Sequence, residues 1–243
     1  MKKVFALLAV FCGIGLASFH AGTQEPDAQQ SSRRYSSNQS AERILNLDDL
    51  KKELKDYYAC TCKCGCYSKD VDVQADRAIA FLQERVSRKK ASEKLALVLD
   101  IDETTLSNYE EMLNADFGYD AKEFAAWVNS GKAPALPGTL RLYQQAQRLG
   151  VSVFFITGRS EDQRDATARN LHAQGFQNWQ QLILRTPDQA HLTAAEYKSG
   201  ARATVEAQGY KIALNVGDQW SDLTGKPEAE FSVKYPDPFY YIP

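Results

Sequence analysis

The chain has 243 residues, 44% of them hydrophobic and 25% charged, which is enough for one well-buried domain with additional segments. Its 29 basic and 31 acidic side chains give a formal net charge of −2, and no long basic stretch interrupts this balance. These features exclude a surface for free nucleic acid, which needs clustered positive charge, but they do not exclude a small nucleotide as ligand.

The first segment is typical of a secretory signal. Lys2 and Lys3 precede an apolar stretch and then small residues, and the apolar part is short for a membrane span. We expect residues 1–21 to be a signal peptide, whose removal takes the formal charge to −4, and residues 22–41 to be a polar linker. This predicts a secreted or periplasmic protein without a stable membrane span. The alternative is an uncleaved signal that keeps the protein at a membrane.

Two predicted helices flank an unusual cysteine run. Apolar residues at helical spacing predict one helix over 44–58 and a second from about Asp70. Four cysteines alternate between them: Cys60, Cys62, Cys64 and Cys66. One residue between cysteines is too few for the usual zinc spacing. The alternatives are local disulfides, an intermolecular crosslink and a soft-metal thiolate cluster.

The run LALVLDIDETT predicts a buried strand that ends in two carboxylates. Leu95–Leu99 are all apolar, and Asp100 and Asp102 follow with one residue between them, so both side chains face the same point on an extended chain. Ligands of α/β folds bind where parallel strands end. One carboxylate can act as a nucleophile and the other can move a proton, with a hard cation between them, which suits phosphoryl transfer.

The next segment, residues 107–134, is rich in aromatic residues and is predicted to be helical in pieces. It can form a small cap that chooses the substrate, with Tyr109, Phe117, Tyr119 and Trp127 either stacking on a nucleobase or aryl group or packing in the core. Pro137 then opens a helix that runs to Leu149, and Gly150 ends it in the left-handed conformation.

A second strand, 151–157, ends in the sequence TGR. Ser160 and Gln163 form a capping-box pattern for the helix that follows, which stops near Gly175. A helix start offers free N–H groups and a positive dipole end, so Thr157 and Gly158 are candidates for holding a phosphoryl group. Arg159 is a candidate substrate ligand, although a solvent-facing or salt-bridged arginine is the commoner interpretation.

Three further strands complete the predicted sheet, over 181–185, 211–218 and 230–235. A helix over 194–208 precedes the second of these strands. Lys198 of that helix is the candidate that offsets negative charge on the phosphoryl group, with Arg185 and Arg202 as competitors. Asp218 and Asp222 can complete a magnesium site with Asp100. Strands alternating with helices predict an α/β fold with a parallel sheet covered on both faces.

The ordered motifs resemble those of the haloacid dehalogenase (HAD) superfamily. Within it, the chain is similar to the secreted acid phosphatases of subfamily IIIB, the class B group that includes plant vegetative storage proteins. The similarity covers roughly Leu45 to Pro243. The motifs that carry it are DIDETTLSNY, GKAPALPGTLRLY, ITGRSEDQR, EYKS, GDQWSDL and YPDPFYYIP.

The resemblance implies a Rossmann-like HAD domain over residues 42–243, with N-terminal helices and a small helical cap at about 107–134. It also implies Mg²⁺ dependence and hydrolysis of phosphomonoesters through an aspartyl-phosphate. The implied roles are as follows: Asp100 as nucleophile, Asp102 as general acid and then base, Thr157, Gly158 and Arg159 as substrate ligands, Lys198 as charge balance, and Asp100, the Asp102 carbonyl, Asp218 and Asp222 at the metal.

The expected substrate is a small phosphomonoester such as a nucleotide or an aryl phosphate, and the expected activity is that of an acid phosphatase. One alternative is phosphotransfer to an alcohol through the same intermediate. Another is a non-catalytic storage or binding protein on the same fold, against which the retained Asp100 argues.

Overall fold

A computed structural model describes residues 45–60 and 66–242. The predicted signal peptide and linker, together with Cys62 and Cys64, lie outside these residues. One compact unit spans Asn46–Pro243. Within the described part of the chain, no helix combines the length and the apolar character that a membrane span requires.

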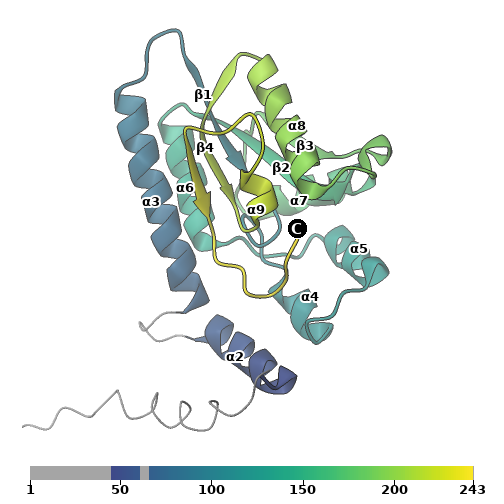
Figure 1. Cartoon of the computed structure of the whole chain (residues 1–243). Coiled ribbons are helices and arrows are strands. Elements are labelled where there is room, and N and C mark those ends of the chain that lie inside the picture. Colours follow the sequence, from purple (N-terminus) through teal and green to yellow (C-terminus); the bar gives the residue numbers. More distant parts are fainter. Residues whose placement is uncertain (1–44, 61–65, 243) are drawn as a thin grey trace, which may run out of the picture. The chain divides into compact units, whose positions relative to one another are not determined.

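Five parallel strands form one sheet in the order β3-β2-β1-β4-β5 (Figure 1). Their bounds are β1 (Lys94–Leu99), β2 (Ser152–Ser160), β3 (Gln181–Arg185), β4 (Tyr210–Gly217) and β5 (Phe231–Lys234). The chain leaves β1 towards β2 on one side and returns to β4 on the other. The strand order therefore reverses between β1 and β4, and the two strands lie next to each other. The predicted parallel α/β sheet is confirmed.

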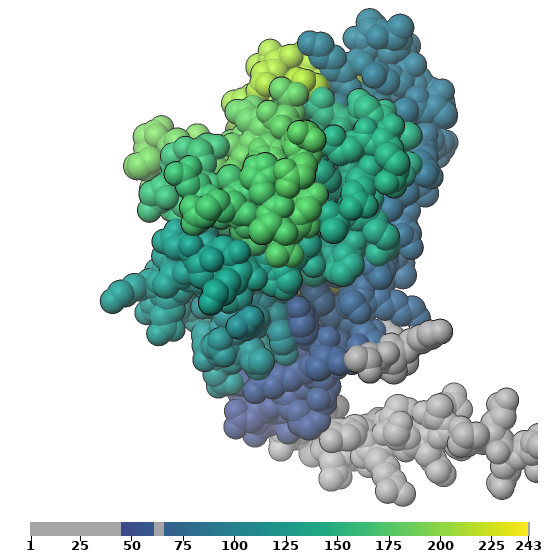
Figure 2. Space-filling view, turned by 180° about the vertical axis from the view of Figure 1, so that it is seen from behind, coloured from purple at the N-terminus to yellow at the C-terminus, as the bar shows by residue number. Residues whose placement is uncertain are grey.

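Side chains of the strands alternate between two buried clusters. Leu95, Leu97 and Leu99 of β1 enter the larger core, whereas Ala96 and Val98 enter the smaller one. The larger core lies under α3 (Tyr67–Ser87), α6 (Pro137–Arg148) and α7 (Arg164–Ala173), and α8 (Ala194–Ala207) covers the smaller one. Seen from behind, the surface of α3 in blue lies beside that of α6 in teal-green (Figure 2). Helices therefore cover both faces of the sheet, as predicted.

The ends of the helices follow the expected local signals. Pro137 is the first residue of α6, and Gly150 after that helix has φ of 67°, which glycine adopts without strain. Ser160 and Gln163 form the predicted capping box. The box opens a 3₁₀ turn, Glu161–Gln163, which leads into α7, and β2 continues past Thr157 to Ser160. Thr157 and Gly158, the candidates for holding a phosphoryl group, therefore lie on the extended end of a strand and not at a helix start.

The segment between β1 and α6 contains two short helices, α4 (Tyr109–Asn114) and α5 (Ala121–Ser130), as expected for a cap that is helical in pieces. The N-terminal helix α2 (Leu47–Ala59) joins α3 through a Cys60–Cys66 disulfide. Tyr58 of α2 stacks on Tyr109, and Phe117 stacks on Phe239 of the C-terminal segment. The last helix, α9 (Trp220–Leu223), follows β4. Three of the four cap aromatics, Tyr109, Phe117 and Trp127, therefore pack against the core.

Candidate active site

Asp100 and Asp218 stand at the point where the strand order reverses. Asp100 follows β1 and its backbone N–H donates to Val216 of β4 at 3.0 Å, so the ladder between the strands continues through this residue. Asp100 therefore keeps the alternation of Ala96 and Val98 and faces α8. Asp218 is the residue after β4. The crevice at the carboxyl ends of these two strands is where ligands of such folds bind.

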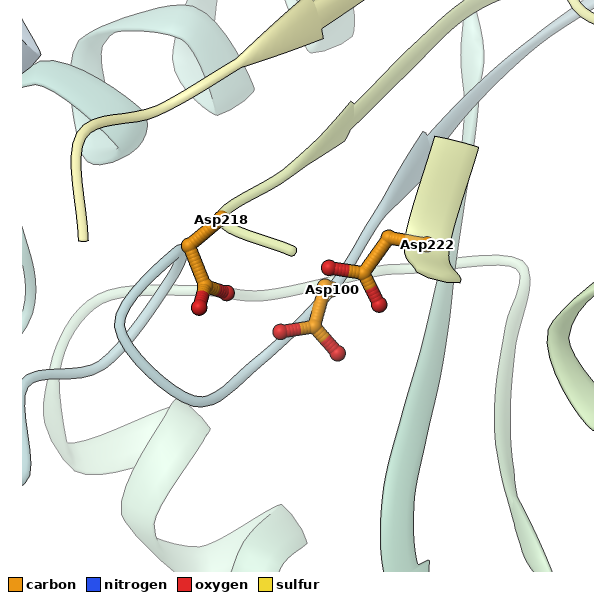
Figure 3. Close-up of side chains that lie close together, drawn as sticks. All are labelled: Asp100, Asp218 and Asp222. Carbon is orange, nitrogen blue, oxygen red and sulfur yellow. The ribbon is translucent and has the colours of Figure 1, made fainter. Parts of the chain in front are cut away.

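Three buried carboxylates converge there: Asp100, Asp218 and Asp222 (Figure 3). Each is at most 6% exposed, and one oxygen from each lies within 4.8 Å of the others. Asp222 reaches the cluster because the chain turns directly after β4, so that the short helix α9 lies at the end of this strand. The backbone N–H of Gln219 donates to Asp222 Oδ2 at 3.0 Å and fixes this turn.

Lys198 of α8 is the cation of this cluster. Its Nζ pairs with Asp100, lies 2.7 Å from Asp222 Oδ1 and donates to the carbonyl of Ile156 at 2.9 Å. Burial by itself would lower the pKa of Lys198, but the two carboxylates raise it above its ordinary value, so the ammonium stays charged. The helix was placed correctly by the sequence pattern, and its buried face carries this lysine towards Asp100.

The cluster has more negative than positive charge. Burial raises the pKa of Asp100 to about 7, with contributions from Asp222 and Asp102 that oppose the effect of Lys198. Burial, followed by Asp222 and Asp100, raises the pKa of Asp218 well above its ordinary value. The three carboxylates form an all-oxygen donor set, and one ammonium group offsets only part of their charge. A hard divalent cation bound between them would balance the rest. These residues therefore fit a divalent metal site.

The carboxylate of Asp102 lies apart from this donor set. Arg159 donates to its Oδ1 from Nε at 3.0 Å and from Nη2 at 2.7 Å, and Asn108 Nδ2 donates to the same oxygen at 2.8 Å. Burial alone would raise the pKa of Asp102, but the Arg159 charge lowers it below its usual value. A metal contact of this residue would involve its backbone carbonyl, which stays a prediction.

Thr157 and Gly158, the candidates for holding a phosphoryl group, lie beside Asp102. Thr157 Oγ1 is 3.4 Å from Asp102 Oδ2 and accepts the backbone N–H of Arg159 at 3.2 Å. Gly158 is exposed, and a Cβ built on it would meet no atom within 4 Å, so this backbone borders open space. The Arg159 guanidinium pairs with Asp102 and also donates from Nη1 to Thr167 Oγ1 at 3.2 Å. Arg159 is therefore a salt-bridged arginine in this structure.

Further residues hold the site, and none of them was predicted from the sequence in this role. Thr104 Oγ1 and Gln219 Nε2 each donate to Asp218 at 2.8 Å. Asn108 binds Asp102, and Arg202 donates to the Asp222 carbonyl at 2.6 Å. Thr104 and Asn108 lie inside the motif DIDETTLSNY, which is a usable signal. Arg202 was a competitor of Lys198 as the charge-balancing cation, but it lies one helical turn after Lys198 and binds the Asp222 carbonyl instead.

Comparisons with known proteins identify the family of this chain. Residues 17–243 match the family described as HAD superfamily, subfamily IIIB (Acid phosphatase). Acid phosphatase 1 of Solanum lycopersicum is 45% identical over 148 residues, which are 60% of this chain and 58% of the relative. The similarity thus spans less than two thirds of that relative. Vegetative storage protein 1 of Arabidopsis thaliana is 33% identical over 213 residues, 82% of this chain and 74% of the relative.

A solved structure shows the same fold. The class C acid phosphatase from Bacillus anthracis with tungstate bound superposes with a TM-score of 0.66 at 23% identity, covering 81% of this chain and 87% of that one. The family match extends over nearly the whole chain, and most of a storage protein more than 30% identical is covered. The expected family is therefore confirmed, and this chain belongs to the acid phosphatases of HAD subfamily IIIB.

Proposed function

We propose that the protein is an acid phosphatase that hydrolyses small phosphomonoesters with Asp100 as nucleophile. The observation that carries the proposal is the buried Asp100 paired with Lys198 beside the carboxylates of Asp218 and Asp222. Membership of an acid phosphatase family and the similarity to a tomato acid phosphatase support it. A buried ion pair of this kind has no evident use in holding the fold, since apolar residues would serve stability as well.

In the first step, an Asp100 oxygen attacks phosphorus in line and a new O–P bond forms. The ester P–O bond breaks, and its electron pair goes to the leaving oxygen, which takes the proton of Asp102 and departs as an alcohol. This step needs Asp102 in its protonated form, although Arg159 lowers its pKa and favours the carboxylate that the second step uses. Lys198 offsets the charge of the nucleophile and of the phosphoryl oxygens. Thr157 and the exposed backbone at Gly158 hold those oxygens.

In the second step, Asp102 is a carboxylate and takes a proton from water. The water oxygen bonds to phosphorus while the acyl-phosphate O–P bond breaks, so that Asp100 is regenerated and phosphate leaves. Arg159 stabilises the ionised form of Asp102 between the two steps, because the buried guanidinium pairs with this half-buried carboxylate at 2.7 Å. The same carboxyl group thus acts first as acid and then as base.

Asp100, Asp218, Asp222 and the Asp102 carbonyl would hold the divalent ion, which we propose to be Mg²⁺. When bound, the ion neutralises charge on the phosphoryl oxygens and orients them. The all-carboxylate donor set and its excess negative charge favour a hard cation over a thiophilic one.

We also propose that the protein works outside the cytoplasm. Residues 1–21 have the composition of a signal peptide, and the Cys60–Cys66 disulfide is typical of oxidising compartments. Cell fractionation with detection of the mature N-terminus tests this. Recovery of the full-length chain in the cytoplasm would contradict it.

Hydrolysis of 4-nitrophenyl phosphate by the purified protein tests the enzymatic proposal. We expect Mg²⁺-dependent turnover that a chelator removes, and an Asp100→Asn protein that is at least about 10⁴-fold slower, as for loss of a covalent nucleophile. Equal activity of the Asp100→Asn protein would show that the nucleophile is wrong. A folded, metal-loaded wild type without activity over the pH range would favour the storage or binding alternative.

A further inference from the structure

A hydrogen-bonded chain connects the cap to Asp102. Trp127 of α5 donates its indole Nε1–H to Asn108 Oδ1 at 2.9 Å. The Asn108 amide group donates from Nδ2 to Asp102 Oδ1 at 2.8 Å and to Glu103 Oε2 at 3.0 Å. The backbone N–H of Asn108 also donates to Glu103 Oε1 at 2.5 Å. A residue of the cap thus reaches the predicted acid–base group through one buried side chain.

Every polar atom of the Asn108 side chain has a partner in this chain. An amide has two N–H donors, which here meet two carboxylates, and one carbonyl oxygen, which meets an indole that can only donate. Asn108 is 1% exposed, so bulk water does not replace Trp127 at that oxygen. Without the indole N–H, the amide oxygen would be buried without a donor, which favours rotation of the side chain away from Asp102.

The chain also distinguishes the two oxygens of Asp102. Oδ1 receives Asn108 Nδ2 at 2.8 Å and Arg159 Nη2 at 2.7 Å, two short contacts from strong donors. Oδ2 has only longer contacts, with Arg159 Nε at 3.3 Å and Thr157 Oγ1 at 3.4 Å. Oδ2 is therefore the oxygen with room for a proton, and it lies on the side of Thr157, the predicted phosphoryl ligand.

We propose that Trp127 is a positioning residue that acts through Asn108 to hold Asp102 with Oδ2 turned towards the substrate. The inference rests on the proposed function, because it concerns the proton transfer of that reaction. In that transfer the O–H bond at Oδ2 breaks, its proton goes to the leaving oxygen, and the ester P–O bond breaks at the same time. Helix α5 thereby controls how well the leaving group is protonated.

The leaving group provides the test. A nitrophenolate departs without much help from a proton, whereas an alkoxide departs slowly unless it is protonated. For Trp127→Phe, we expect kcat/KM on glycerol phosphate to fall about tenfold or more, and kcat/KM on 4-nitrophenyl phosphate to stay within about threefold of wild type, because general acid catalysis contributes about 10²–10⁴-fold. We compare kcat/KM because it covers only the steps up to departure of the leaving group, whereas kcat also includes the second step, in which Asp102 acts as base on either substrate. Equal losses on both substrates, or no loss on either, would overturn the proposal.

Trp179→Phe is the matched control. Trp179 is also partly buried, but its ring packs on Phe155 of β2 and on His172 of α7. We expect its ratio of the two rates to equal that of wild type. The ratio compares two substrates on the same protein, so a fraction of unfolded enzyme lowers both rates alike and does not imitate the predicted effect.

A double variant tests the route through Asn108. If Trp127 acts through this residue, Trp127→Phe adds no further change in the rate ratio to an Asn108→Ala protein. An additive change would overturn the route. Asp102→Asn should show the largest ratio change of all. A wild type inactive on both substrates would refute the proposed function itself, whereas an active wild type with an unchanged ratio in Trp127→Phe refutes only this inference.

Discussion

Gly217 shows how one missing methyl group places a candidate metal ligand. A Cβ built on Gly217 would lie 2.4 Å from the Cβ of Asp222 and 2.5 Å from its Oδ2. Gly217→Ala must therefore displace Asp222 and the start of α9. We expect a loss of about 1–3 kcal/mol in stability, as for overpacked cores, and about 100-fold in activity, as for a misplacement of about 1 Å.

Thermal melting and kcat at saturating Mg²⁺ measure these effects of Gly217→Ala. Gly200→Ala is the control, because Gly200 lies within α8 and a Cβ there meets nothing within 4 Å. Alanine is the better helix former, so this variant should be slightly more stable and fully active. A Gly217→Ala protein with wild-type activity would mean that the position of Asp222 is not critical.

Lys198 is the second prediction at the scale of single residues. Its ammonium lies between Asp100 and Asp222, and all three side chains are less than 9% exposed. Lys198→Met leaves carboxylates buried without their cation, a change that costs about 3–5 kcal/mol. We expect the variant to melt well below wild type in chelator and to recover part of the difference in Mg²⁺, because the ion supplies the missing positive charge. Equal melting temperatures in chelator would contradict this.

At the scale of elements, Arg202 fastens α8 to the loop after α9. Its guanidinium donates to the carbonyls of Asp222 at 2.6 Å, Pro227 at 2.9 Å, Gly225 at 3.1 Å and also Thr224. A lysine has three donors on one nitrogen and does not reproduce this fork. We expect Arg202→Lys to lose about 2–3 kcal/mol in urea unfolding and to weaken activity through Asp222, because carbonyls lose buried partners.

The matched control for Arg202→Lys is Arg148→Lys. Arg148 is at the end of α6, and its side-chain hydrogen bonds go to Gln145 three residues earlier on the surface. Substitutions at such positions change stability by less than about 0.5 kcal/mol. If both variants lose the same free energy of unfolding, the hydrogen bonds from Arg202 to the loop after α9 do not contribute to stability.

The sequence could predict the elements and residues that follow a periodic pattern, and it could not predict contacts that have none. Strand β3 was predicted with its observed bounds and β1 to within one residue, because buried parallel strands read as continuous apolar runs. Asp100, Thr157 and Asp218 could be chosen because each ends such a run. The indole of Trp127 on Asn108 and the guanidinium of Arg202 on a distant loop have no periodic signal. The four-residue helix α9 is also too short for one.

For the molecule as a whole, we expect stability to depend on pH. A network at the opposite end of the sheet from the site bears on this. Arg85 of α3 donates to Glu230 from Nε at 2.5 Å and pairs with Glu93 at 2.9 Å, while Lys211 of β4 lies 2.5 Å from Glu230. One glutamate thus connects the longest helix of the described chain with two strands of the sheet.

Glu230→Gln tests the pH dependence of this connection. Burial alone would raise the pKa of Glu230, but hydrogen bonds from Arg85 and Lys211 lower it below the value of 4.5 for a free side chain. A carboxyl group whose pKa is lowered on folding stabilises the native state above its unfolded pKa, and this contribution disappears as the pH falls through the folded value. We therefore expect wild type to exceed Glu230→Gln by about 1 kcal/mol at pH 7, typical of a well-formed surface pair. The difference should shrink as the pH falls below 4.5 and through the lowered pKa of the folded state. Urea unfolding across this range measures it, with Glu228→Gln as control. Lys226 lowers the pKa of Glu228 in the same direction, but both side chains of that pair are exposed, so we expect a smaller difference. A difference that grew towards low pH would reverse the sign and refute the assignment.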